Sequence, residues 1–267
     1  MHHNTKKLSD YSTFIFDLDG CIHFGNTVAE GAPELLALLH SANKQVFFLS
    51  NNSTHSPASI SNKLSKMGIT APADSVYLAS SLTGRYILEQ HGKSTLCVAG
   101  TEDLISELQQ YGHTTVLPES SCSADILVLG RDLQFDFTRL KACANRILNG
   151  AAFYACNADL THPSLDGGCE PETGALAAAL TAMTGIEPKT FGKPTQYAYQ
   201  CIMDDFALPA SECLMVGDNP LTDIKGALTA DMDACWLMLT KKAETMPKGT
   251  THAYPTIKAL FEAIQKS

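Results

Sequence analysis

The sequence lacks the long apolar run that a membrane-spanning helix needs. No stretch of about 18 consecutive apolar residues occurs in its 267 residues, although 45% of them are hydrophobic. The first twelve residues are polar and contain no apolar segment of the kind found in signal peptides. We therefore expect a protein that neither crosses a membrane nor carries a secretion signal.

Cysteine pairs at metal-ligand spacing are also absent. The nine cysteines are scattered along the chain, and no two of them form a C-x-x-C motif. An odd number of scattered cysteines is typical of a reducing compartment, and it argues against a disulfide framework or a zinc site. We expect a cytoplasmic location.

Positive charge is scarce as well. The chain has 19 lysines and arginines against 28 aspartates and glutamates, which gives a net charge of −9. This balance argues against a nucleic-acid or anionic-membrane partner. An anionic substrate would have to be bound where positive charge is concentrated locally, by a metal ion, a lysine or helix N-termini.

Strand-like and helix-like segments alternate along the whole chain, and its length favours two domains. The pattern predicts strands at 13–16, 45–50, 95–99, 126–129, 152–156, 213–217 and 234–238. It predicts helices at 31–42, 57–67, 101–111, 137–148, 173–184 and 195–206. Alternation of this kind indicates an α/β fold with a mostly parallel sheet covered on both faces. The middle of the chain repeats the alternation and is expected to form its own α/β domain.

Two acidic residues end the first of these strands. Asp17 and Asp19 follow the apolar run 13–16 and precede Gly20. Carboxylates this close raise each other's pKa unless a cation lies between them. Open α/β sheets bind their ligands at the carboxyl ends of strands. The pair therefore favours a site for a divalent cation and a phosphoryl group, with a solvated turn as the alternative.

Polar residues follow other predicted elements in the same way. They are Ser50 with Asn51 and Asn52, Lys193 before the helix at 195–206, and Asp218 with Asp223. Parallel strands bring their carboxyl ends to one edge of the sheet, so we expect these residues to converge there. Each of them taken alone could instead be a helix cap, a turn or a solvated surface residue.

This set of side chains suits phosphoryl transfer. One carboxylate can act as a nucleophile, and a second can protonate the leaving oxygen and then activate water. Carboxylate oxygens suit Mg²⁺, while lysine and hydroxyl donors balance the charge on the phosphoryl oxygens.

The motifs resemble the signature of the haloacid dehalogenase superfamily of phosphatases. They are Asp17-Leu18-Asp19-Gly20, Ser50, Lys193, and Gly217-Asp218 with Asp223. The long insert and the segments 49–54 and 156–159 resemble the branch of NagD-like proteins, 4-nitrophenylphosphatases and phosphoglycolate phosphatases. The resemblance implies a Rossmann-like, doubly wound parallel-sheet core over 1–79 and 187–267. It also implies an inserted α/β cap domain over 80–186.

The resemblance also implies a role for each motif residue. Asp17 is expected to be the nucleophile and Asp19 the general acid and base. The family's Mg²⁺ is bound by the side chains of Asp17 and Asp218 and by the backbone carbonyl of Asp19, and Asp223 is an orienting residue. The residues expected to bind the phosphoryl group are Ser50, Asn51, Asn52 and Lys193.

The cap is expected to choose the substrate. The loop 157–172 is the segment that we expect to face the active site, with Asn157 and Asp159 as substrate contacts; a solvated loop is the alternative. Many relatives carry an arginine where His55 stands, which weakens the case for a dianionic substrate such as phosphoglycolate. Relatives often form homodimers through the cap, and the same is expected here.

We therefore expect a Mg²⁺-dependent phosphatase that acts through an aspartyl-phosphate intermediate. Its substrate would be a small phosphorylated metabolite: a nucleoside monophosphate, a sugar phosphate, phosphoglycolate or pyridoxal phosphate. One alternative is a phosphotransferase or phosphomutase on the same core. Another is a phospho-accepting signalling module, but such receivers are single small domains and lack an acid two residues after the acceptor.

Overall fold

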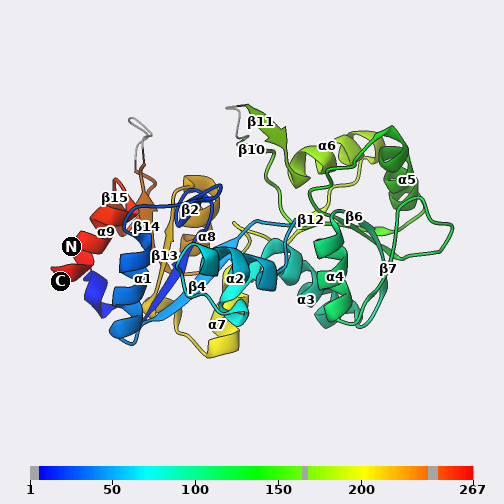
Figure 1. Ribbon diagram of the computed structural model, residues 1–267. Coiled ribbons are helices and arrows are strands. Elements are labelled where there is room, and N and C mark those ends of the chain that lie inside the picture. Colours follow the sequence, from blue (N-terminus) through cyan, green and yellow to red (C-terminus); the bar gives the residue numbers. More distant parts are fainter. Residues whose placement is uncertain (1–5, 164–167, 240–245, 267) are drawn as a thin grey trace. The chain divides into compact units, whose positions relative to one another are not determined.

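The computed structural model describes residues 6–163, 168–239 and 246–266, which fall into two compact units (Figure 1). The first unit contains the described parts of Met1–Ser50, Ile60–Tyr77 and Lys193–Ser267. The second contains the described parts of Asn51–Ser59 and Leu78–Gly192. Within the described ranges, no helix has the length and apolar character needed to cross a bilayer.

A six-stranded sheet forms the centre of the first unit, in the order β15-β14-β13-β1-β4-β5. Its strands are β1 (Thr13–Phe16), β4 (Gln45–Ser50), β5 (Val76–Leu78), β13 (Cys213–Gly217), β14 (Asp233–Leu237) and β15 (His252–Tyr254). β1 pairs in parallel with β4 and β13, and β14 pairs in parallel with β13 and β15. Every residue of β1 and β13 is buried, as expected for central strands of a sheet covered on both faces.

Helices cover this sheet. They are α1 (Ala32–Ser41), α7 (Gln196–Phe206), α8 (Lys225–Thr229) and α9 (Ile257–Gln265). A further helix, α2 (Pro57–Lys66), has residues in both units. α1 packs on α9 and α7 packs on α8, and the strands lie between these two pairs (Figure 1). The shorter elements are the strands β2 (His23–Phe24) and β3 (Thr27–Val28), the 3₁₀ turns η1 (Leu8–Asp10), η2 (Ala73–Ser75) and η3 (Ala210–Glu212), and a π-helical turn, η4 (Pro220–Ile224).

The second unit is built around a parallel five-stranded sheet in the order β12-β9-β8-β6-β7. The strands are β6 (Thr95–Ala99), β7 (Thr114–Val116), β8 (Ile126–Leu129), β9 (Ala152–Ala155) and β12 (Lys189–Thr190). Its helices are α3 (Ala79–His91), α4 (Glu102–Gln110), α5 (Phe137–Leu148) and α6 (Thr173–Thr184), and a hairpin of β10 (Thr161–Pro163) and β11 (Cys169–Pro171) precedes α6.

Alternating side chains of this second sheet build two separate cores. In β6, Leu96 and Val98 join one cluster, while Cys97 and Ala99 join the other. Side chains of successive strand residues point to opposite faces, so a fully apolar strand supplies both. Residues of α3 and α4 complete the first cluster, and residues of α5 and α6 complete the second. The unit therefore has its own hydrophobic core on each face of its sheet.

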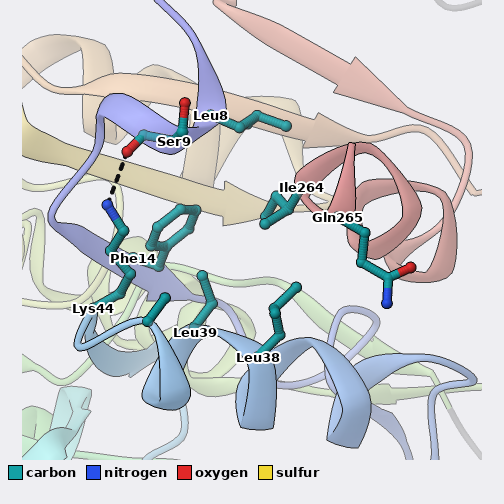
Figure 2. A pocket seen from close by; sticks show the side chains of 9 residues that line it. Leu8, Ser9, Phe14, Leu38, Leu39, Lys44, Ile264 and Gln265 are labelled. Atoms are coloured by element: carbon teal, nitrogen blue, oxygen red, sulfur yellow. Dashed lines mark hydrogen bonds between the residues drawn. The ribbon is translucent and has the colours of Figure 1, made fainter. Parts of the chain in front are cut away.

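A small cavity of about 200 Å³ lies beside β1 in the first unit (Figure 2). Leu38 and Leu39 of α1, Phe14 of β1 and Ile264 of α9 supply most of its apolar wall. Lys44 closes one side by donating from Nζ to the backbone oxygen of Ser9, 2.8 Å away. Ser9, Lys44 and Gln265 are the polar residues of a mostly apolar wall, so we assign the cavity to imperfect packing between α1 and α9.

The structure confirms the predicted α/β fold with parallel sheets covered by helices. The segments 45–50, 95–99, 126–129, 137–148, 173–184 and 213–217 match their elements at both ends. The sequence reading did not find α3, α9 or the short strands β2, β3, β5, β7, β10, β11, β12 and β15. All eight of these strands have only two or three residues, which is too short for a period of two to be recognised.

The buried aromatic residue in β1 provides a test of the first unit's packing. The Phe14 ring is fully buried, stacked on Phe16 and edge-on to Tyr11, with both centroid distances 6.3 Å. We expect Phe14→Ala to lower the free energy of unfolding by about 3–5 kcal/mol in a urea titration. Phe24→Ala, at a residue that is 51% exposed, should change it by less than about 0.5 kcal/mol. Equal effects of the two changes would contradict this packing.

Candidate active site

Three neighbouring strands of the first unit end at the same edge of the sheet. Phe16 of β1 is level with Phe48 of β4 and with Val216 of β13. Asp17 follows at once, and its backbone N–H donates to the carbonyl of Val216 over 2.9 Å. Since β4 ends at Ser50 and Asp218 follows β13, the register brings the three predicted motifs to one edge.

A tight turn carries the chain away from Asp17. The carbonyl of Leu18 accepts hydrogen bonds from the backbone N–H groups of residues 21–23. Gly20 adopts a φ of +90°, which glycine tolerates far better than other residues. A Cβ atom there would also lie 3.0 Å from the carboxylate of Asp218. Glycine at this position therefore permits both the turn and the approach of Asp218.

A buried lysine joins two of the predicted acids. The Lys193 Nζ lies 2.5 Å from Asp17 Oδ1 and 2.7 Å from Asp223 Oδ1. The three residues are 3%, 7% and 0% exposed in that order. The second oxygen of Asp223 accepts from the backbone N–H of Asn219, 3.0 Å away. Lys193 is thus a buried partner of the predicted nucleophile.

Burial and charge shift the protonation of this group in opposite directions. Burial raises the pKa of Asp17 well above its usual range; Asp223 and Asp218 add to the rise, while Lys193 opposes it. Burial lowers the pKa of Lys193, but Asp17 and Asp223 outweigh that effect and raise it well above its usual range. The lysine therefore stays charged, and a further cation near Asp17 would favour the carboxylate that a nucleophile needs.

The loop after β13 is fixed by contacts that the sequence did not reveal. The indole Nε1 of Trp236 donates to the backbone carbonyl of Asp218 over 3.0 Å. The hydroxyl of Tyr199 donates to the backbone oxygens of Thr222 and Asp223 in η4. Trp236 is the one tryptophan in the sequence, but nothing in its local pattern connects it with Asp218. Such contacts depend on strand order, which the sequence alone did not provide.

Close packing shapes the same loop. A Cβ atom on Gly217 would lie only 2.2 Å from Asp223 Oδ2, so a larger residue would displace that carboxylate. η4 is a single π-helical turn, an element often found at functional sites. The loop therefore holds Asp218 and Asp223 in defined places.

The acids of this edge fit a hard divalent cation. Asp17, Asp218 and Asp223 each offer a carboxylate oxygen, and the three atoms lie within 4.8 Å of one another. Three carboxylates and one ammonium group leave two net negative charges, which a divalent cation would balance. Oxygen ligands of this kind suit Mg²⁺. Both oxygens of Asp223 are already engaged, Oδ1 with Lys193 and Oδ2 with the backbone N–H of Asn219, so Asp17 and Asp218 are the better candidates for ligands.

The side chain of Asp19 lies outside this group of three acids and is 44% exposed. Its Oδ1 lies 3.3 Å from Nδ1 of His23, a buried residue that the sequence reading missed. Burial lowers the pKa of His23, and the charge of Asp19 opposes the shift. The Asp19 carboxyl therefore lies apart from the two acids that contact Lys193.

The remaining predicted residues belong to the second unit. Asn51 Nδ2 donates to Asp159 Oδ2 over 2.9 Å, and Asn157 Nδ2 donates to the Asn51 carbonyl over 2.7 Å. Asn52 Oδ1 accepts from the backbone N–H groups of Thr54 and His55, so it shapes its own loop. The structure thus brings Asn51, Asn157 and Asp159 together. Their roles toward phosphate or substrate stay predictions, and residues 164–167 of the predicted cap loop lie outside the described residues.

Comparison with known proteins gives consistent matches. Residues 14–114 match the family model described as haloacid dehalogenase-like hydrolase, and residues 190–258 match a HAD-hydrolase-like model. An acid sugar phosphatase of Staphylococcus saprophyticus is 30% identical over 97% of this chain and 99% of its own length. A 5'-nucleotidase of Bacillus subtilis is 30% identical over 85% of this chain and 86% of its own length. The solved 4-nitrophenylphosphatase of Thermotoga maritima superposes with a TM-score of 0.87 at 28% identity, covering 96% of this chain and 98% of that one.

Removing the buried lysine tests its electrostatic role. Lys193→Met keeps an apolar stem but leaves Asp17 and Asp223 without their cation. We expect a loss of about 3–5 kcal/mol in the free energy of unfolding, measured in urea with a chelator present. The surface pair of Lys258 and Glu30, at 2.6 Å, provides the matched control, and Lys258→Met should leave the unfolding midpoint nearly unchanged.

The effect of pH on the stability lost in Lys193→Met provides a second measurement for the same test. Losing Lys193 removes the charge that opposes the raised pKa of Asp17. Folding then takes up a proton between the unfolded and the folded pKa of Asp17, so the stability of the variant falls as pH rises through that window. The loss should be smaller at about pH 5 than at about pH 8. A loss that grows toward acid pH would contradict the assignment.

Proposed function

Because the chain belongs to the haloacid dehalogenase-like hydrolases and is an enzyme of the phosphatase type, we propose that it hydrolyses small phosphomonoesters at Asp17 with Mg²⁺ as its cofactor. The contact of Lys193 with Asp17 and Asp223 carries the proposal. It places a buried carboxylate and a fixed positive charge together, in the positions of the family's motifs. Asp17 can then attack phosphorus while Lys193 balances the charge of the phosphoryl oxygens.

The reaction has two steps. A carboxylate oxygen of Asp17 attacks phosphorus, the P–O bond to the alcohol breaks, and the leaving oxygen takes a proton from Asp19. Asp19 then accepts a proton from water, whose oxygen attacks the phosphorus of the aspartyl phosphate and releases inorganic phosphate. Ser50 at the end of β4 donates to a phosphoryl oxygen during both steps. Both carboxyl groups end the cycle as they began it.

Asp17 and Asp218 would hold the Mg²⁺ ion, together with the backbone carbonyl of Asp19 that the family resemblance implies. The bound ion supplies positive charge that offsets the repulsion between the Asp17 carboxylate and an anionic substrate. Asp223 and Tyr199 contribute indirectly: Asp223 orients Lys193, and the hydroxyl of Tyr199 fixes the turn that carries Asp223.

The names of the relatives support two substrate classes. One curated relative is called an acid sugar phosphatase and another a 5'-nucleotidase. Sugar phosphates and nucleoside monophosphates are therefore the first compounds to test, followed by phosphoglycolate and pyridoxal phosphate. We further propose that the second unit is the cap, that Asn157 and Asp159 contact the substrate, and that homodimers form through it. All nine cysteines are free, which supports a reducing, cytoplasmic setting.

Replacing the nucleophile tests the reaction itself. Asp17→Asn should lower the rate of phosphate release from p-nitrophenyl phosphate by more than about 10³-fold, because no acyl phosphate can form on an amide. The variant keeps the contact of Lys193 with Asp223, so its circular dichroism should match that of the parent. Glu30→Gln, at an exposed acid that pairs with Lys258 and contacts none of the motif residues named above, is the control and should keep full activity.

Two outcomes would contradict this mechanism. A fully active Asp17→Asn variant would rule out Asp17 as the nucleophile. Transfer of the phosphoryl group to an added sugar, without release of inorganic phosphate, would identify a phosphotransferase instead of a phosphatase.

The single tryptophan gives a direct readout of metal binding. Its indole donates to the carbonyl of Asp218, so we expect saturable changes in tryptophan emission when Mg²⁺ is added and reversal by a chelator. Asp218→Asn should weaken this response by at least about tenfold in Mg²⁺ concentration, because it replaces a charged ligand with a neutral one. Asp204→Asn, an exposed acid of α7, is the matched control. An unchanged titration in Asp218→Asn would exclude Asp218 as a ligand.

A further inference from the structure

His23 is a buried polar side chain that the reaction described above does not use. It lies in β2, is 1% exposed, and neither of its ring nitrogens has a hydrogen-bond partner among the described residues. Leaving a buried polar group unsatisfied costs about 1–3 kcal/mol. An apolar residue would fill the same space without that cost, so the imidazole calls for a functional explanation.

The Asp19 carboxyl is the polar group that the structure places against this ring. Nδ1 of His23 lies 3.3 Å from Asp19 Oδ1, close enough for a small rotation of the half-exposed carboxyl to form a hydrogen bond. The ring itself is held in place by its backbone. Gly20 N donates to the His23 carbonyl over 2.9 Å, and His23 pairs with Val28 of β3. The imidazole of His23 is therefore held in place beside an Asp19 carboxyl that is free to rotate.

We propose that His23 is a positioning residue that holds the Asp19 carboxyl in the orientation needed for proton transfer. The inference rests on the proposed function of Asp19 as general acid and base. An exposed carboxyl samples several rotamers, and fixing one of them costs side-chain entropy. A buried imidazole that donates from Nδ1 lowers that cost by favouring one orientation, which is how catalytic groups are commonly pre-organised.

Substrates with different leaving groups can distinguish a misplaced Asp19 carboxyl from a general structural effect of replacing His23. An alkoxide needs a proton as it departs, whereas p-nitrophenolate leaves readily without one. Faulty placement of Asp19 should therefore slow hydrolysis of an alkyl phosphate such as glycerol phosphate more than hydrolysis of p-nitrophenyl phosphate. A defect in folding or phosphate binding would slow both to the same extent.

The matched pair of variants is His23→Leu and His23→Asn. The two replacements have nearly the same size and shape, but only asparagine can place an amide N–H near the position of Nδ1. We expect His23→Leu to lower kcat for glycerol phosphate by about tenfold and for p-nitrophenyl phosphate by less than about threefold. His23→Asn should recover most of the loss on glycerol phosphate. Equal losses on both substrates, or no recovery with asparagine, would overturn the proposal.

A double-mutant cycle with Asp19→Asn completes the test. If His23 acts through Asp19, His23→Leu should have little further effect on kcat in the Asp19→Asn background. If His23→Leu lowers kcat by the same factor in both backgrounds, the inference about His23 is overturned, while the role of Asp19 is left intact. An Asp19→Asn variant that keeps full activity on glycerol phosphate would instead contradict the proposed acid–base role. Phe24→Ala, at the exposed neighbour in β2, is the control for disturbance of the hairpin.

Discussion

The site in the first unit depends on one buried lysine. Lys193 lies between Asp17 and Asp223, and all three are almost completely buried. A buried carboxylate without a counter-charge is several kcal/mol less favourable than the same group in water. The contact joins the end of β1, the segment that leads into α7, and the π-helical turn η4. The acids at the end of β1 and in η4 therefore depend on the same lysine for their counter-charge.

Backbone geometry determines where these charged side chains lie. The parallel register of β1 with its two neighbours places Asp17, Ser50 and Asp218 at the same edge. Glycines at 20 and 217 let carboxylates approach the backbone where any Cβ would intrude. A one-residue slip of β1 would turn Asp17 to the other face of the sheet and separate it from Lys193. Strand register and charge compensation therefore specify the same structure.

Asp17, Ser50 and Asp218 could be predicted from sequence because each follows or ends an apolar strand segment, while Lys193 was recognised by its place before a predicted helix. Asp17, Lys193, Asp218 and Asp223 do come together, as the sequence predicted. Tyr199 and Trp236 could not be found in this way, because they act through contacts between separate elements. His23 is only four residues from Asp19, but nothing in the local sequence indicates that its ring is buried beside that carboxyl. Short strands such as β12 and β15 were also missed, since two or three residues carry no recognisable period.

The sheet order also bears on how the chain is made. β1 is a central strand, but its partner β13 follows it by about 200 residues, and Lys193 is 176 residues after Asp17. At the usual pace of about 5–20 residues per second, the ribosome takes roughly 10–35 s to make the residues between Asp17 and Lys193. During that time one edge of β1 has no neighbour and its acid has no counter-ion. The nascent chain therefore carries an open strand edge through most of its synthesis, and such an edge can pair with other chains.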